Sequence, residues 1–194
     1  YRVTTLFFIP LVLLSFISPV LAATPIPCGQ PLNSSISTVG EFDDYTFTAS
    51  AQDAVTIRLT RTSGTMDPYL ELYGPTGQKI TENYSTSDNY ARIDQTLYTA
   101  GTYTIRVSDY GNDEMGNYSL ICQWMNNLCN ATPLTCGQTF VTCGTCHTVQ
   151  HDFFTFPAQA QDKVTIRLIS TSNLDPYLEL YDPTGWKIAE NSPS

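Results

Sequence analysis

Both histidines of this 194-residue chain lie in one segment that contains a Cys-x-x-Cys-His pattern. Cys143, Cys146 and His147 have the residue types and spacing of a c-type haem attachment site. His151 adds a second histidine, so that the segment also holds four side chains of types that bind zinc. A disulfide needs neither cofactor and requires the fewest assumptions. We therefore expect Cys143 and Cys146 to form disulfides, with haem c or a bound metal as the alternatives.

Two parts of the chain repeat one another at an offset of 108 residues between Cys28 and Cys136. The repeat argues against haem, because the first copy has neither Cys nor His where the second has the Cys-x-x-Cys-His pattern. The matching runs are Cys28-Gly29-Gln30 with Cys136-Gly137-Gln138, Val55–Leu59 with Val164–Leu168, Asp67–Tyr73 with Asp175–Tyr181, and Gly74–Asn83 with Asp182–Asn191.

Hydrophobic residues alternate with polar ones along several short runs of the first copy, as they do in half-buried strands. Segments rich in Gly, Pro, Asn and Asp separate these runs, and no useful helical period follows the N-terminal apolar stretch. The pattern predicts an all-β fold, an antiparallel β-sandwich of jelly-roll-like form, in tandem with a truncated second copy. The inward-facing residues are expected to be Tyr45, Phe47, Val55, Ile57, Leu59, Leu70, Leu72, Tyr103, Ile105, Val107, Tyr118, Leu120 and Cys122.

The N-terminal apolar stretch predicts export. Residues 1–22 contain Arg2, an apolar run interrupted by two prolines, and small residues at Val20 and Ala22 that suit cleavage, which together are typical of a secretory signal peptide. We expect a secreted, extracellular protein with no membrane attachment after cleavage. The rest of the chain divides into repeat 1 at 28–123, a linker at 124–135 and an incomplete repeat 2 at 136–194.

Export favours disulfides for the six cysteines. Cys28 stands at the start of repeat 1, and Cys122 lies on the inward face of its last predicted strand. A bond between Cys28 and Cys122 would join the two ends of the domain, and we predict that pair. Cys129 is then left over in the linker and could bond Cys136 locally, or one of the two cysteines of the Cys-x-x-Cys pair.

Four strand motifs in order carry a family resemblance: Asp43–Phe47, Asp67–Tyr73, Gly101–Val107 and Gly116–Leu120. They resemble the bacterial and archaeal pre-peptidase C-terminal domain and, through it, the collagen-binding modules of bacterial collagenases. The resemblance implies a β-sandwich appended to secreted proteins that carries no chemistry itself. It also implies that exposed aromatics would contact a ligand, and the tyrosines at predicted strand ends and turns are Tyr69, Tyr73, Tyr84, Tyr90, Tyr98 and Tyr110.

Some relatives bind calcium through an acidic segment before the first strand, but here that segment, 24–35, has no carboxylate. A hairpin with four oxygen-bearing side chains within six residues is an alternative calcium site. Its residues are Asp109, Asn112, Asp113 and Glu114. Four Asn-x-Ser/Thr sequons predict glycosylation if the host modifies exported proteins, at Asn33, Asn83, Asn117 and Asn130.

Composition excludes several function classes. The net charge is −9 and no basic run exists, so nucleic-acid binding is not expected. No hydrolase motif or phosphate-binding loop occurs, which predicts a protein that is not an enzyme and needs no cofactor. We expect a noncatalytic extracellular binding or structural module whose partner is an extracellular polymer or protein surface. The alternatives are accessory domains of a secreted hydrolase or peptidase, and an extracellular c-type haem protein.

Overall fold

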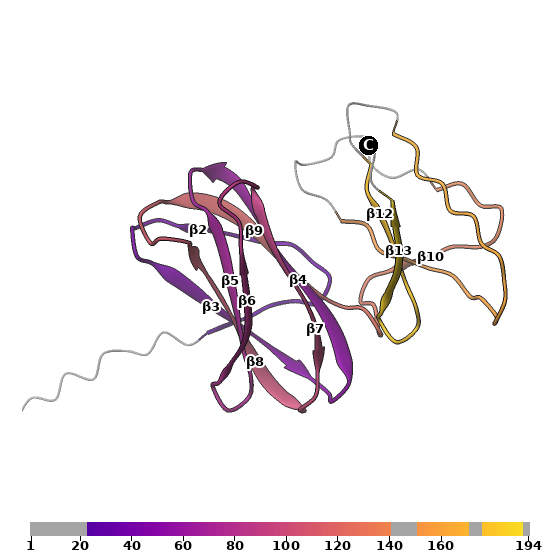
Figure 1. The fold of residues 1–194 in the computed structure, drawn as a ribbon, viewed down its shortest axis with the longest axis horizontal. Coiled ribbons are helices and arrows are strands. Elements are labelled where there is room, and N and C mark those ends of the chain that lie inside the picture. Colours follow the sequence, from indigo (N-terminus) through magenta and orange to yellow (C-terminus); the bar gives the residue numbers. More distant parts are fainter. Residues whose placement is uncertain (1–22, 141–150, 171–175, 192–194) are drawn as a thin grey trace, which may run out of the picture.

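The computed structural model describes residues 23–140, 151–170 and 176–191, and nine strands of the first repeat form two sheets that pack face to face (Figure 1). The described residues form strands and no helix, so none of them belongs to a helix that could cross a membrane. The predicted signal peptide, 1–22, lies outside the described residues. The strands are β1 Thr24–Pro25, β2 Leu32–Ile36, β3 Phe42–Ala49, β4 Asp53–Gly64, β5 Pro68–Tyr73, β6 Lys79–Tyr84, β7 Tyr90–Leu97, β8 Gly101–Asp109 and β9 Gly116–Trp124.

One sheet has the strand order β1-β3-β8-β5-β6 and the other has the order β2-β9-β4-β7. All neighbouring pairs of these sheets are antiparallel except β1 with β3. Most neighbours in each sheet are not consecutive in sequence, so the chain crosses repeatedly between the sheets. The predicted all-β, antiparallel fold is confirmed.

The core lies between the two sheets and contains all of the residues whose alternation predicts it. It also contains Ile26, Ile36, Ala49, Met66, Ala91, Ile93 and Leu97. Ile57, Leu59, Leu70, Leu72 and Ile105 are fully buried at 0% exposure. Each such side chain stabilises the fold by about 1.5–3 kcal/mol through burial. Tyr45 and Tyr118 bring polar atoms into this core, and their hydroxyls satisfy one another by a 2.6 Å hydrogen bond.

The second repeat forms fewer strands among its described residues. They are β11 Phe154–Thr155, β12 Leu178–Tyr181 and β13 Lys187–Asn191, of which β12 and β13 form an antiparallel hairpin. β10 Thr132–Pro133 lies in the linker and pairs with β11. Residues 156–170 belong to no strand. Val164, Ile166 and Leu168 are therefore 38–49% exposed, although their counterparts in β4 are buried between β7 and β9. The tandem sandwich stays a prediction.

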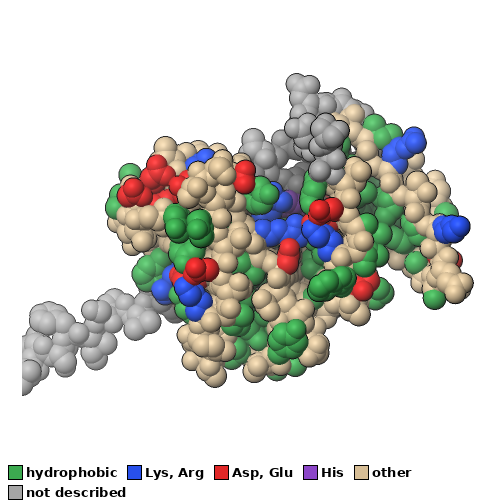
Figure 2. All heavy atoms as spheres, in the orientation of Figure 1, with side chains coloured by type: hydrophobic (Ala, Val, Ile, Leu, Met, Phe, Trp, Pro, Cys, Tyr) green, Lys and Arg blue, Asp and Glu red, His purple; other side chains and the backbone are tan. Residues whose placement is uncertain are grey.

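The second repeat contacts the outer face of the four-stranded sheet through charged groups. Arg92 of β7 donates two 2.8 Å hydrogen bonds from Nη1 to the two carboxylate oxygens of Glu179 in β12, and it also donates to the Tyr181 hydroxyl. Figure 2 shows Lys, Arg, Asp and Glu side chains gathered where the two repeats meet. We call this contact the inter-repeat joint and define it by Arg92, Glu179 and Tyr181.

The predicted Cys28–Cys122 disulfide is wrong. Cys28 bonds Cys129 instead, and Cys122 is a free thiol buried in the core. The backbones of Cys28 and Cys122 do meet in an isolated parallel bridge. However, the Cys28 Sγ lies 3.5 Å from the Gln123 side chain, and successive residues of a strand face opposite sides, so Cys28 points away from the Cys122 thiol.

The observed disulfide also excludes the alternatives that pair Cys129 with Cys136 or with the Cys-x-x-Cys pair, and Cys136 is an exposed free thiol. A tight chain path brings Cys28 and Cys129 together. Gly29 has a φ of 64°, and a Cβ at this position would lie 2.7 Å from the Cys129 carbonyl oxygen. Only glycine fits here without displacing the backbone.

Candidate functional site

Three tyrosine rings from three separate elements meet on the outside of the five-stranded sheet. The rings of Tyr84 and Tyr110 stack in parallel with centroids 3.8 Å apart and an interplanar angle of 4°. The ring of Tyr69 stands edge-on to both, at 6.1 Å from Tyr84 and 5.8 Å from Tyr110. We call Tyr69, Tyr84 and Tyr110 the tyrosine cluster.

Strand register places the first two of these rings. Tyr69 alternates in β5 with the buried Leu70, so its side chain faces outward, and Tyr69 pairs directly with Tyr84 of β6. Residues opposite one another on paired strands have side chains close enough to interact. The sheet therefore brings Tyr69 and Tyr84 together without help from any loop.

A buried carboxylate holds the loop that supplies the third ring. Asp109 is 1% exposed, and its oxygens accept hydrogen bonds from the backbone N–H groups of Asp67, Asp113 and Glu114 at 2.7–3.1 Å. The N–H of Tyr110 donates to the Asp67 carbonyl at 2.9 Å. These bonds fix the start of the β8–β9 loop against the end of β5, so Tyr110 is positioned on a rigid support.

A charged network lies beside the rings. The Lys79 ammonium contacts Glu71 at 3.1 Å and Glu82 at 2.5 Å, and the Tyr69 hydroxyl donates to Glu82 at 2.8 Å. Burial, the hydrogen bond to Glu82 and the charge of Glu71 raise the pKa of Tyr69 to about 12. Hydrogen bonds from Lys79 and Tyr69 hold the pKa of Glu82 below its usual range, so Glu82 carries a negative charge at neutral pH.

The cluster offers a flat aromatic surface to solvent. Tyr84 is 46% exposed and Tyr110 is 40% exposed although the two rings are stacked. Tyrosine combines a large apolar area with a polar tip and loses little entropy when it is held in contact, so it is enriched in binding surfaces. The arrangement is suited to binding.

The other tyrosines predicted to face a ligand do not join the cluster. Tyr73 lies near Arg106, whose guanidinium is 5.5 Å from the ring centroid, and Tyr90 lies under Arg58 at 4.2 Å. Tyr98 is 72% exposed in the turn between β7 and β8. The predicted set of six tyrosines thus divides into one compact cluster and three separate positions.

Asp109, one of the four residues of the predicted calcium hairpin, has a different role. Its carboxylate accepts hydrogen bonds from the three backbone N–H groups described above. Asn112 has a positive φ of 57° at the turn of this hairpin. Among the described residues, no group of three or more His, Cys, Asp or Glu side chains could hold a metal ion. Calcium binding by Asp109, Asn112, Asp113 and Glu114 stays a prediction.

All four predicted glycosylation asparagines are exposed. Asn117 donates from Nδ2 to the Ser63 hydroxyl at 2.7 Å, and Asn130 donates from Nδ2 to the Cys28 carbonyl at 3.1 Å. At Asn83 the amide oxygen accepts a 3.0 Å bond from the Arg92 N–H. Modification of Asn33, Asn83, Asn117 and Asn130 stays a prediction.

The Cys-x-x-Cys-His pattern of Cys143, Cys146 and His147 lies outside the described residues. His151 is described and lies close to the inter-repeat joint. Its Nε2 is buried and has no hydrogen-bond partner among the described residues. Burial and the charges of Arg58 and Arg92 lower the pKa of His151 to about 4, so its imidazole is neutral at pH 7.

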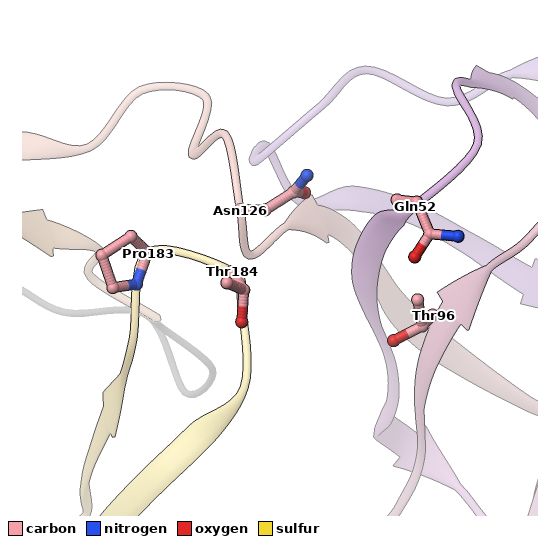
Figure 3. A pocket seen from close by; sticks show the side chains of 5 residues that line it. All are labelled: Gln52, Thr96, Asn126, Pro183 and Thr184. Carbon is pink, nitrogen blue, oxygen red and sulfur yellow. The ribbon is translucent and has the colours of Figure 1, made fainter.

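A cavity of about 480 Å³ opens between the two repeats, lined by Gln52, Thr96, Asn126, Pro183 and Thr184. Figure 3 shows the Gln52 and Thr96 side chains on the edge of the sandwich, with Asn126 at the end of β9 and Pro183 and Thr184 on the turn between β12 and β13. None of the five side chains is an acid or a base, so the lining supplies no general acid or general base.

Sequence reasoning missed the charged partners of these sites. Lys79 and Glu82 belong to the repeated "KI-x-EN" run, and Lys187 and Glu190 are their counterparts. In both repeats these two charges follow a tyrosine, Tyr69 or Tyr177, at the same spacing in the sequence. That recurrence was the signal that could have identified the charged network. Arg92 and His151 carried no such signal, because they act between the repeats.

Comparison with known proteins supports the resemblance. Residues 41–109 match the family model described as the bacterial pre-peptidase C-terminal domain. Among curated proteins, none has a sequence that matches this chain.

Three solved structures are similar to about half of the chain. The pre-peptidase C-terminal domain of a collagenase from Bacillus anthracis is 18% identical, covers 52% of this chain and 94% of its own, and has a TM-score of 0.45. PliG of Aeromonas hydrophila, a periplasmic inhibitor of g-type lysozyme, is 20% identical to this chain. It covers 52% of this chain and 93% of its own, with a TM-score of 0.42. PliG of Salmonella Typhimurium is 18% identical, with coverage of 52% and 96% and a TM-score of 0.33. The family match thus places the similarity to the bacterial pre-peptidase C-terminal domain in residues 41–109 of the first repeat.

Proposed function

We propose that this chain is a noncatalytic module of a secreted protein, and that it attaches to an extracellular protein or polymer surface through the tyrosine cluster. The observation that carries the proposal is the exposed Tyr84–Tyr110 stack, held on a rigid sheet and an anchored loop. The match to a pre-peptidase C-terminal domain supports a role beside catalysis rather than in it. The predicted signal peptide supports an extracellular location.

The test is attachment of the exported chain to extracellular material. Radiolabelled protein is incubated with insoluble collagen, cell-wall polysaccharide and fixed cells, and the bound fraction is measured. We expect the wild type to bind one of these surfaces and the double variant Tyr84→Leu/Tyr110→Leu to lose most of that binding. Tyr98→Leu removes an exposed ring outside the cluster and serves as the matched control. Equal binding by all three proteins would exclude the cluster as the attachment site.

A second candidate function is an accessory domain of a secreted hydrolase or peptidase, which the family match favours. The complete coding sequence of the gene distinguishes the two. A catalytic motif there would favour the accessory role, and further repeats would favour an attachment array. The haem hypothesis for Cys143, Cys146 and His147 has its own test, because covalently bound haem gives a Soret band and a mass surplus that survives reduction.

A further inference from the structure

Outward-facing aromatic rings in this protein hold arginine side chains. Arg106 lies over Phe42 with its guanidinium carbon 4.0 Å from the ring centroid, and it also lies 5.5 Å from Tyr73. Arg58 lies 4.2 Å from the centroid of Tyr90. These are the cation–π contacts of the described residues, and none of them uses the tyrosine cluster. The largest exposed group of stacked rings in the first repeat therefore has no cation over it.

The second repeat repeats the tyrosine and charge network of the first. The Tyr177 hydroxyl donates to Glu190 at 2.8 Å, as the Tyr69 hydroxyl does to Glu82. Lys187 contacts Glu179 and Glu190 at 3.2 and 2.6 Å, in the way that Lys79 contacts Glu71 and Glu82. The same short sequence has thus built the same polar surface twice.

In the second repeat this surface receives an arginine from outside its own repeat. Arg92 binds both carboxylate oxygens of Glu179 and donates to Tyr181. The charge of Arg58 also interacts with that of Glu179. Glu179 and Tyr181 correspond to Glu71 and Tyr73 of the first repeat, where Arg106 already lies 5.5 Å from the Tyr73 ring. The inter-repeat joint therefore shows that a guanidinium binds beside the repeated network, and the positions of Glu82 and Tyr84 hold no arginine.

The corresponding surface of the first repeat is larger and acidic. Tyr84 and Tyr110 extend it with two exposed rings. Glu71 and Glu82 both pair with Lys79, Glu71 also lies opposite Arg106 of β8, and the Glu82 side chain is 43% exposed. The loop that carries Tyr110 adds Asp113 and Glu114, and the whole chain has a net charge of −9. Aromatic faces surrounded by carboxylates complement a cation.

We propose that the tyrosine cluster binds an arginine side chain of an extracellular protein partner, with the guanidinium stacked on the Tyr84–Tyr110 rings and paired with Glu82. This inference rests on the proposed attachment function and names its partner chemistry. Arginine is favoured over lysine because its planar guanidinium stacks on a ring and pairs with a carboxylate at the same time. A neutral glycan would stack on the rings and hydrogen-bond to the carboxylates but would form no ion pair with them.

The experiment titrates the whole exported chain, labelled on its tyrosine rings, with acetyl-Gly-Arg-Gly-Arg-Gly-amide, and follows the ring resonances by NMR. Peptides with citrulline or lysine in place of arginine are the matched ligands, since citrulline keeps the planar shape and lacks the charge. We expect the arginine peptide to shift the Tyr84 and Tyr110 resonances and to bind at least about fivefold more tightly than the citrulline peptide.

Variants locate the site. Tyr84→Leu should weaken binding of the arginine peptide by about threefold to tenfold, and Glu82→Gln should weaken it and reduce its dependence on salt. Tyr98→Leu should leave binding unchanged. Thermal unfolding of each variant separates loss of the site from loss of the fold, and a variant that unfolds is replaced by Tyr110→Leu.

Three outcomes would overturn the proposal: citrulline and arginine peptides that bind equally, a cello-oligosaccharide that shifts the same resonances while the arginine peptide does not, or equal losses in Tyr84→Leu and Tyr98→Leu. The proposed function fails separately. If the cluster variants lose attachment to extracellular material but no arginine peptide binds or competes, attachment stands and arginine recognition is wrong. If the peptide binds as expected but the chain attaches to no extracellular material, arginine recognition stands and the attachment function is wrong.

Discussion

Arg92 and Glu179 lie 87 residues apart in the chain and form a bidentate ion pair, with Nη1 of Arg92 2.8 Å from each carboxylate oxygen of Glu179. Their side chains are only 17% and 16% exposed. An ion pair removed from water in this way leaves a costly unpaired charge when one partner is lost.

Glu179→Gln should therefore loosen the contact between the repeats. We expect it to destabilise the joint by about 1.5–3 kcal/mol, the range for hydrogen bonds to charged groups. Small-angle scattering should show a larger radius of gyration for the variant. Glu190→Gln makes the same chemical change at a side chain that is 52% exposed and bound to Lys187, and it should change stability by less than about 1 kcal/mol. Equal effects of the two variants would contradict a structural role for the Arg92–Glu179 pair.

The joint should also weaken in acid, first through His151. Burial lowers the pKa of this imidazole from 6.5 in the unfolded chain to about 4 in the folded one, together with the charges of Arg58 and Arg92. The charges of Glu179 and Asp152 act in the opposite direction and are outweighed. Between these two values the unfolded state binds a proton that the folded state does not, so stability falls as the pH decreases from about 6.5 to about 4. The loss reaches at most about 3 kcal/mol.

Glu179 adds to this loss at lower pH. Burial alone would raise its pKa, but the hydrogen bonds and charge of Arg92 outweigh burial and hold the pKa below 4.5. Its stabilisation is present above pH 4.5 and disappears as the pH falls through the lower, folded-state pKa. Urea unfolding of wild type and His151→Gln from pH 7 to pH 3 separates the two groups. The variant should lack the slope between pH 6.5 and 4 and keep the one below it, and an unchanged upper slope would assign that slope to other groups.

The Cys28–Cys129 disulfide closes a loop with a sequence separation of 101 residues. Removing it by the double variant Cys28→Ser/Cys129→Ser should lower the free energy of unfolding by as much as about 4–5 kcal/mol, because the unfolded chain gains conformational entropy. Native alkylation should label Cys136, which is exposed, and leave Cys122 unlabelled until the protein unfolds. Burial raises the pKa of Cys122 to about 12, which slows its reaction further. Peptide mapping that finds Cys122 in a disulfide would contradict the structure.

Alternation of apolar and polar residues predicted the all-β class and the inward faces, because a half-buried strand needs that alternation to exclude water. Leu32–Ile36 and Lys79–Tyr84 were not among the predicted strands. Both lie at sheet edges, where few side chains need to be buried. Polar runs such as "NSS" and "TEN" can therefore form strands there without the alternation that was used for the prediction. The disulfide could not be predicted from position alone, since it depends on which side of the chain each thiol faces. The tyrosine cluster was predicted only as separate tyrosines, because its third ring comes from a loop whose path depends on Asp109.

The pentapeptide Val-Thr-Ile-Arg-Leu occurs once in each repeat. The rates of trypsin cleavage at its two arginines can therefore be compared at the same local sequence. In the first copy Arg58 lies in the middle of β4, between β7 and β9. In the second copy Arg167 is exposed and belongs to no strand. Cleavage after Arg58 requires the sandwich to open, whereas cleavage after Arg167 requires only a local fluctuation.

We therefore expect trypsin to cut after Arg167 at least about 100-fold faster than after Arg58, which corresponds to about 3 kcal/mol in the free energy of opening. Mass spectrometry of early time points gives both rates from one digest, and the sequence preference of the protease cancels because the pentapeptides are identical. Lys163 lies in the same exposed segment and should be cut at a rate similar to that at Arg167. Comparable rates at Arg58 and Arg167 would show that the second copy of the strand is protected as well as the first, and that it forms a sheet of its own.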